Sequence, residues 1–132
     1  QLTVTFTIEP VDVPSGGVFQ ARLVIANPTF SAVTLPSTYD CAAFLSTVRG
    51  DEAVVVEGTQ FYCPGAFVSF TIPANGELVR TYDLVARVRA PSDPPSAYAA
   101  APPGTYTMRA DLNISLPDPE TDFRVIAAGA AR

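Results

Sequence analysis

The chain contains no histidine and no tryptophan, and each absence removes classes of protein. Histidine is the usual base beside a serine or cysteine nucleophile and a frequent ligand of zinc and haem iron. Ser-His-Asp and Cys-His catalytic sites and histidine-ligated zinc or haem sites are therefore excluded. Tryptophan packs against the intersheet disulfide of antibody domains, and that class of domain is excluded as well. We therefore expect a protein that is not an enzyme and that needs no cofactor.

Lysine is also absent, so all eight basic residues are arginines, and they do not cluster along the sequence. The formal net charge is −5. Because phosphate binding needs a basic patch that displaces counterions, a nucleic acid partner is excluded. The exclusive use of arginine fits either a bias in genomic composition or interface contacts that depend on the guanidinium group.

No apolar run approaches the roughly 20 residues that a helix needs to cross a bilayer. We expect no transmembrane segment, and membrane association only through a partner. The chain begins in a strand pattern at Gln1, without Met or a charged leader, which we interpret as a mature chain after removal of a signal peptide. With an even number of cysteines, this predicts a periplasmic or extracellular location.

The length of 132 residues and a hydrophobic content of 48% predict one domain over residues 1–132, large enough for its own core. Thirteen prolines and eight glycines accompany abundant valine, threonine, phenylalanine and tyrosine. Such a composition favours strands joined by turns over helices.

Alternation of apolar and polar residues marks strands that bury one face. It is clearest over residues 2–8, 19–25 and 104–116. In the predicted strand 78–88, Arg80 interrupts the apolar set and indicates a bulge or an edge position. Turn residues fill 9–17. The remaining predicted strands are 31–35, a hairpin over 39–63 with its tip at 49–52, 68–72 and 123–127, before a small-residue tail at 128–132.

Eight or nine short strands without a helical crossover predict an antiparallel, two-sheet, immunoglobulin-like Greek-key sandwich. An up-and-down barrel is the alternative. Tyr106, which follows Gly104 after a proline-rich approach, is typical of a tyrosine corner, in which the hydroxyl bonds to nearby backbone. The simpler interpretation is a tyrosine that only faces the core.

The two cysteines, Cys41 and Cys63, flank the predicted hairpin. A redox pair or half of a metal site would bring a C-x-x-C spacing or more thiols, so we predict a disulfide that closes the base of the hairpin. A loop of this length should stabilise the fold by about 3 kcal/mol in the chain-entropy model.

Several short motifs occur in a fixed order along the chain. They are Asn27-Pro28, Tyr39-Asp40 before the hairpin, Gly58-Thr59-Gln60-Phe61, the turn 73–77 and Pro103-Gly104-Thr105-Tyr106. This order, over about residues 19–116, resembles the BsuPI family, bacterial immunoglobulin-like domains named for an intracellular proteinase inhibitor. The resemblance implies an immunoglobulin-like fold and proteinase inhibition as one function, without assigning a reactive-site residue.

The least ordinary segment is the proline- and alanine-rich loop at 90–103, which is too long for a tight connection. Its prolines favour an extended polyproline conformation, and Tyr98 is of the residue type enriched at binding hot spots. We predict that Asp93, Pro94, Pro95 and Tyr98 contact a protein partner. The alternative is a plain surface crossover between the sheets.

Acidic residues occur in two predicted turns, Asp51-Glu52 and the group Asp118, Glu120 and Asp122. We interpret both as solvated turns rather than acid–base pairs. Calcium is the alternative occupant of the second group, which lacks the glycine and bidentate glutamate of a dedicated calcium loop.

These observations predict a non-catalytic protein-binding or structural module, an accessory subunit of an exported assembly, in a complex with a different protein. One alternative is a proteinase inhibitor, from the family resemblance. The other is a self-assembling filament or surface subunit in which the strand at 2–8 pairs with a neighbouring copy.

Overall fold

The computed structural model describes residues 2–39, 43–59, 67–112 and 116–128. Within these ranges the regular structure is almost entirely strand, and the one helical segment is a single 3₁₀ turn, η1 (Pro95–Ala97). The prediction of an all-β fold is confirmed. The strands are β1 (Thr3–Glu9), β2 (Asp12–Pro14), β3 (Val18–Ala26), β4 (Val33–Tyr39), β5 (Ala43–Arg49), β6 (Glu52–Glu57), β7 (Phe67–Ile72), β8 (Glu77–Arg89), β9 (Ala99–Ala100), β10 (Gly104–Leu112) and β11 (Glu120–Ile126).

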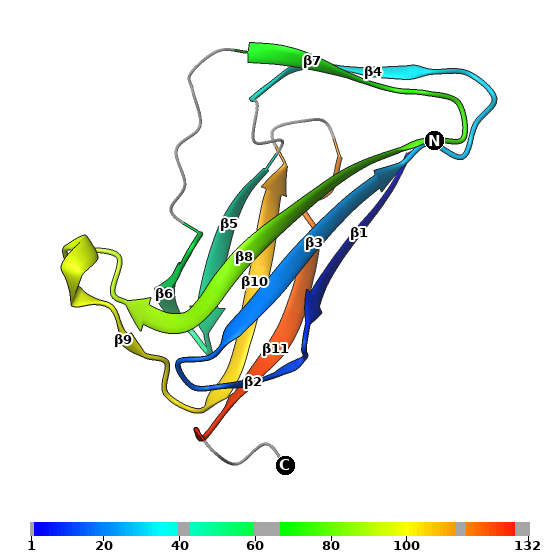
Figure 1. Ribbon diagram of the computed structural model, residues 1–132. Coiled ribbons are helices and arrows are strands. Elements are labelled where there is room, and N and C mark those ends of the chain that lie inside the picture. Colours follow the sequence, from blue (N-terminus) through cyan, green and yellow to red (C-terminus); the bar gives the residue numbers. More distant parts are fainter. Residues whose placement is uncertain (1, 40–42, 60–66, 113–115, 129–132) are drawn as a thin grey trace.

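Nine of these strands form one hydrogen-bonded sheet in the order β1-β3-β8-β6-β5-β10-β11-β2, with β9 beside β8 (Figure 1). The pairs are antiparallel except β2 with β11, which is parallel. Strand β6 pairs with β5 through Val54 and with β8 through Val55, so it joins the two halves of the sheet. Contact between β1 and β11 brings the ends together. The result is a nearly closed, barrel-like sheet, in which the predicted division into two sheets is not clear-cut.

The strand order also bears on the alternative fold. In an up-and-down barrel each strand pairs with its neighbours in the sequence, whereas here β3 pairs with β8 and β5 pairs with β10. An up-and-down barrel is therefore wrong for this chain.

Most predicted strands lie within a few residues of the observed ones, including the hairpin β5–β6 with its tip at Gly50 and Asp51. Two short strands were not predicted. Strand β2 lies inside the segment 9–17, which was interpreted only as turns, and β9 lies inside the loop 90–103. The last part of the predicted strand 104–116 includes 113–115, which lie outside the described residues.

Among the described residues, the part of β8 around Arg80 has a strand partner on one side. The register between β3 and β8 runs through Leu23 and Arg80 without a bulge. On the other side, β6 pairs only with the end of β8, from Val85 to Arg89. Of the two interpretations of Arg80, the bulge is wrong for the β3–β8 pair, and the edge position fits the pairing of the described residues.

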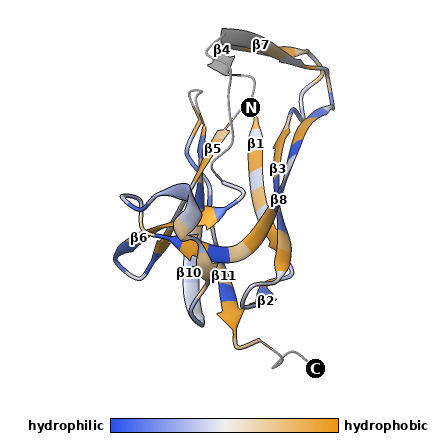
Figure 2. Ribbon diagram, turned by 60° about the vertical axis from the view of Figure 1, so that its left-hand side comes forward, coloured by the Kyte–Doolittle hydropathy of each residue, from blue (hydrophilic) through white to orange (hydrophobic). Residues whose placement is uncertain are grey.

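The core forms between the two halves of the barrel, because the alternating apolar residues of each strand point inward. Figure 2 shows the alternation of hydrophobic and hydrophilic residues along β1 and β3. Phe123 on β11 lies at the centre, with its ring centroid 5.1 Å from that of Phe19 on β3 and 5.4 Å from that of Tyr106 on β10. Other buried core residues include Phe6, Ile8, Ala21, Leu23, Ile25, Leu45, Leu84, Met108, Ala110 and Val125.

Tyr106 forms the predicted tyrosine corner. Its side chain is only 1% exposed, so it faces the core as the simpler interpretation required. Its hydroxyl also donates a 2.6 Å hydrogen bond to the carbonyl oxygen of Pro102, four residues earlier. Both interpretations of this tyrosine hold, and the bond fixes the end of the loop that leads into β10.

The strands β4 and β7 form a separate two-stranded sheet beyond one end of the barrel (Figure 1). Asn27, which is 1% exposed, connects this sheet to β3. Its side-chain amide donates to the carbonyl oxygens of Ser31, Ile72 and Pro73 at 2.8, 3.1 and 3.2 Å. Because Ile72 ends β7 and Ser31 precedes β4, one buried side chain holds both strands at their base.

No helix in the described ranges is long and apolar enough to cross a membrane.

Candidate partner-binding site

The predicted binding segment, residues 90–103, is called the arm here. It leads from β8 to β10 and projects from the side of the barrel, where it contains η1 and β9 (Figure 1). Asp93, Pro94 and Pro95 are exposed, and Tyr98 is half-buried. The backbone of Pro94 has φ −69° and ψ 159°, the polyproline conformation that was predicted, before η1 turns the chain.

The first turn of the arm is closed by hydrogen bonds around Asp93. The Asp93 carboxylate accepts from the backbone amide of Ala90 at 3.2 Å, and the Asp93 amide donates to the Ala90 carbonyl oxygen at 3.0 Å. From the end of β8, Arg89 Nη1 donates to the Asp93 carbonyl oxygen at 2.8 Å. Asp93 therefore shapes the arm itself, and the partner contact predicted for it from the sequence stays a prediction.

Two arginines of β8 hold Tyr98 in place. The guanidinium carbon of Arg89 lies 5.2 Å from the centroid of the Tyr98 ring, within cation–π range. Arg87 Nη2 donates to the Tyr98 carbonyl oxygen at 2.9 Å, while Arg87 Nη1 forms an ion pair with Glu57 at 2.9 Å. The side chain and the backbone of Tyr98 are thus both fixed to the sheet.

The second half of the arm joins the sheet directly. Strand β9 pairs with β8 through Ala99 and Ala100. Ala101 is buried, its amide donates to the Ala86 carbonyl oxygen at 2.8 Å, and its own carbonyl oxygen accepts from the Ser15 hydroxyl at 2.6 Å. The arm is anchored at both ends, with its prolines on the outside.

A hollow of about 300 Å³ lies between the arm and the β5–β6 turn. Val54, Ala97 and Pro102 contribute apolar walls, and Arg49 and Arg89 contribute positive charge. Among the described residues, neither arginine is ion-paired to a carboxylate, and the buried Nε of Arg89 has no hydrogen-bond partner. The same hollow also has Glu52 and Asp93 in its lining, so its charge is mixed.

Gly104 allows Arg49 to reach this position. Its φ of 152° lies in the region that favours glycine, and a Cβ there would lie 3.1 Å from Arg49 Nε. Arg49 Nη2 donates to the Pro103 carbonyl oxygen at 3.0 Å, and its guanidinium carbon lies 5.9 Å from the Tyr106 ring centroid. Burial raises the pKa of the Tyr106 hydroxyl, and the charge of Arg49 opposes part of that rise.

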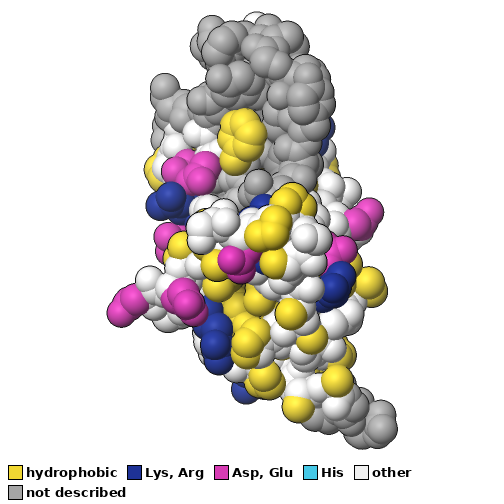
Figure 3. Space-filling model, turned by 90° about the vertical axis from the view of Figure 1, so that its left-hand side faces the viewer, with side chains coloured by type: hydrophobic (Ala, Val, Ile, Leu, Met, Phe, Trp, Pro, Cys, Tyr) yellow, Lys and Arg dark blue, Asp and Glu magenta, His cyan; other side chains and the backbone are white. Residues whose placement is uncertain are grey.

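The side of the molecule that carries the arm has hydrophobic side chains gathered in its middle, with acidic and basic side chains beside them (Figure 3). An apolar centre with charged neighbours is the usual arrangement of a protein–protein interface.

The other candidate sites of the sequence are distributed differently. Asp118 accepts a hydrogen bond from the Leu112 amide at 2.8 Å, and Asp122 accepts from the Thr107 hydroxyl at 2.7 Å, so both carboxylates serve the β10–β11 connection. In the described part of the chain, no group of three or more acidic, histidine or cysteine side chains is placed to hold a metal ion. The predicted disulfide between Cys41 and Cys63 lies outside the described residues.

Sequence reasoning missed the three arginines that organise the arm, Arg49, Arg87 and Arg89. The last two alternate at the end of a predicted strand, which looks like an ordinary solvent-exposed pattern. Their abundance relative to lysine was the only signal, and it was interpreted as either composition bias or interface chemistry. In the structure, Arg87 and Arg89 form hydrogen bonds to the arm and hold it on β8.

No protein-family model and no curated protein sequence matches this chain. Solved structures do match its fold. A β-glucosidase, EmGH1, from Erythrobacter marinus matches with a TM-score of 0.56 and 12% identity, over 96% of this chain and 15% of the enzyme. A β-glucosidase from Listeria innocua in complex with isofagomine matches with a TM-score of 0.53 and 11% identity, over 97% of this chain and 16% of the enzyme.

At these identities the likeness concerns the fold alone. The chain spans only 15–16% of the length of the β-glucosidases that it matches, so it resembles one part of a much larger protein.

Proposed function

We propose that this chain is a non-catalytic protein-binding module, an accessory subunit of an exported protein assembly, and that the arm is its binding surface. The observation that carries the proposal is that Arg87 and Arg89 hold the arm on β8 while Pro94 and Pro95 remain exposed. A segment that is already ordered loses little conformational entropy when it binds. Exposed prolines on a fixed support are suited to contact another protein.

The hollow beside the arm indicates the chemistry of the partner. Its apolar walls suit a small aliphatic side chain. Arg49 and Arg89, which form no ion pair with a carboxylate among the described residues, offer guanidinium groups to a carboxylate beside Glu52 and Asp93 in the same lining. A partner segment with an acidic residue next to an apolar one would satisfy both.

The immunoglobulin-like Greek-key sandwich remains our proposal for the fold family. The order of the strands and the tyrosine corner at Tyr106 support it, although β6 joins the two halves. The β-glucosidases match this chain over a small part of their own length, which fits a module that works beside other domains or subunits. In such scaffolds, activity lies in loops and sheet edges.

An exported location is part of the proposal and rests on the predicted disulfide. Intact-mass measurement with and without reductant tests the disulfide. Two free thiols in the untreated protein would contradict the disulfide and remove this support for an exported location. Proteinase inhibition stays a prediction from the BsuPI resemblance, and protease assays with the purified protein test that function separately.

The test of the binding role uses native mass spectrometry of the protein isolated from its own source. We expect a complex with a different protein, and expect it to be lost in the variant Pro94→Gly/Pro95→Gly. The variant Pro117→Gly changes an exposed proline outside the arm and should leave the complex intact. A complex that survives the arm variant, or a protein with no partner at all, would overturn the proposal.

A further inference from the structure

Two exposed apolar features lie at opposite ends of β3. Val18, its first residue, is 76% exposed, and Phe30, four residues beyond its last residue, is 93% exposed. A strand of this length spans on the order of 30 Å, so the two side chains cannot meet within one chain. These are the two most exposed large hydrophobic side chains in the described part of the molecule.

Phe30 is carried by a turn that hydrogen bonds hold rigid. The side-chain oxygen of Asn27, Oδ1, accepts hydrogen bonds from the Thr29 backbone amide at 3.1 Å and from the Thr29 hydroxyl at 2.6 Å. The Asn27 side-chain amide donates to the Ser31 carbonyl oxygen at 2.8 Å. The single hydroxyl hydrogen of Thr29 is shared between the Asn27 side-chain oxygen and this Ser31 carbonyl oxygen, which lies 2.9 Å from the hydroxyl oxygen. Because the residues on both sides of Phe30 are fixed, its ring projects from an ordered support and loses little entropy on binding.

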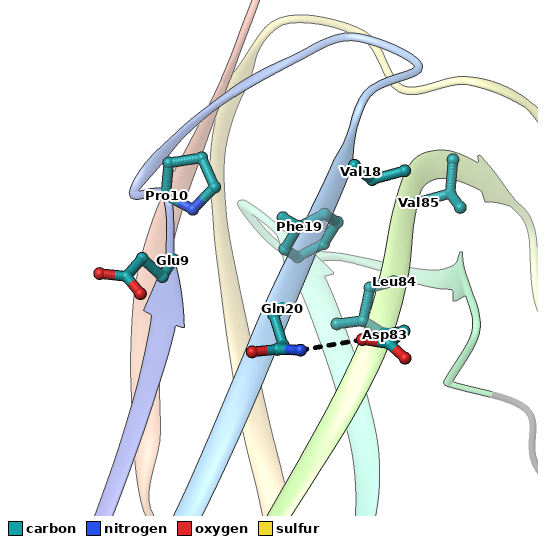
Figure 4. A pocket seen from close by; sticks show the side chains of 8 residues that line it. All are labelled: Glu9, Pro10, Val18, Phe19, Gln20, Asp83, Leu84 and Val85. Atoms are coloured by element: carbon teal, nitrogen blue, oxygen red, sulfur yellow. Dashed lines mark hydrogen bonds between the residues drawn. The ribbon is translucent and has the colours of Figure 1, made fainter.

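Val18 lines a hollow of about 540 Å³ at the other end of β3 (Figure 4). Pro10 and Val85 line it as well, and the buried Phe19 and Leu84 complete its apolar lining. The hollow is open to solvent rather than enclosed. We call it the β3 hollow.

Polar groups line one side of the β3 hollow. Gln20 donates to the Asp83 carboxylate at 2.9 Å, and Glu9 lies on the other side of Gln20 in the register of β1, β3 and β8 (Figure 4). The turn that carries Phe30, residues 27–32, has no charged side chain. It can therefore approach these two carboxylates without like-charge repulsion.

We propose that Phe30 of one copy inserts into the β3 hollow of a second copy. The two surfaces are different and lie at opposite ends of the molecule, so the contact is head-to-tail and leaves a free Phe30 and a free hollow at the two ends. Repetition gives an open chain of subunits rather than a closed dimer. This self-association uses neither the arm nor the edge of β1, and it is independent of the proposed binding function.

Sedimentation velocity over a range of protein concentrations tests the proposal. We expect the wild type to form species that grow with concentration, and expect Phe30→Ser and Val18→Asp each to reduce the association constant at least tenfold. Phe30→Leu keeps an apolar side chain and should retain most of the association. Val48→Asp, a control on a different exposed valine, should associate like the wild type. Circular dichroism confirms that each variant is folded.

A mixture of the two defective variants gives the sharpest outcome. Phe30→Ser retains the hollow and Val18→Asp retains the phenylalanine, so together they should form one-to-one pairs that grow no further. A monomeric wild type would overturn the proposal. So would a mixture that stays monomeric, or single variants that associate as strongly as the wild type.

Discussion

The side-chain amide of Asn27 donates a hydrogen bond to the carbonyl oxygen of Ile72, which is 45 positions later in the chain. The bond joins the end of β3 to the end of β7. Asn27 is buried and also serves the turn before β4, so among the described residues it provides a buried polar connection between the barrel and the two-stranded sheet.

We predict that Asn27→Ala destabilises the protein by about 3 kcal/mol, because it leaves buried carbonyl oxygens without their donor. Thr29→Ala, which removes a hydroxyl from the same turn, should lose only about 1 kcal/mol. Urea denaturation at neutral pH measures both values. Equal losses in the two variants would show that Asn27 has no special role.

Tyr106→Phe should lower the free energy of unfolding by about 1 kcal/mol, because it removes the bond to Pro102 and keeps the packed ring.

Loss of the Tyr106 hydroxyl should also change how the free energy of unfolding depends on alkaline pH. Burial raises the pKa of Tyr106 above its ordinary value of 10.0, so the tyrosine ionises at lower pH in the unfolded chain than in the folded protein. That contribution to stability is complete below about pH 10 and is lost as the pH rises through the folded-state pKa. Denaturation at pH 8 and pH 11 should show a smaller alkaline loss for the variant than for the wild type.

Asp12→Asn should weaken the acid dependence of stability. Arg124 donates to the Asp12 carboxylate at 3.0 and 2.7 Å, and this hydrogen bonding holds the pKa of Asp12 below its ordinary value of 3.8. The pair stabilises the fold above the unfolded pKa, and its contribution disappears as the pH falls through the folded-state pKa. Both groups are exposed, so the effect is small. Comparison of thermal unfolding at pH 7 and pH 3 should give a smaller difference for Asp12→Asn, and an unchanged difference would contradict the assignment.

Arg89→Gln should loosen the arm and leave the barrel folded. It removes the cation–π contact with Tyr98 and the bond to the Asp93 carbonyl oxygen. We expect faster hydrogen exchange at the amides of Asp93 and Ala97, whose bonds close the turns of the arm. Arg22→Gln, on the exposed face of β3, is the matched control and should change neither amide. Identical exchange in wild type and Arg89→Gln would show that Arg89 does not hold the arm.

The strands were predictable where one face is buried, since the alternation of apolar residues carries the signal. It identified β1, β3 and β10. The tyrosine corner at Tyr106 was indicated instead by the proline-rich approach to Gly104. Strand β2 could not be predicted, because its three residues pair in parallel with β11, more than a hundred positions away, and it ends at Pro14. That pairing depends on how the barrel closes and leaves no local pattern.

The arm was predicted as a segment, and its architecture was not. Its prolines and Tyr98 are visible as composition, whereas the contacts of Arg87 and Arg89 depend on the path that the arm takes back over β8. The role of Asn27 was predicted only in part as well. The sequence Asn27-Pro28 indicated the end of a strand, but the bond from Asn27 to β7 exists only in the folded protein. Side chains that connect distant segments require the tertiary structure.

The central claim, that the arm binds a protein partner, is tested most directly by the affinity of the isolated partner for wild type and for Pro94→Gly/Pro95→Gly. Isothermal titration calorimetry gives both dissociation constants. We predict at least tenfold weaker binding by the arm variant, with Pro117→Gly equal to the wild type. Equal affinities for all three proteins would contradict the claim.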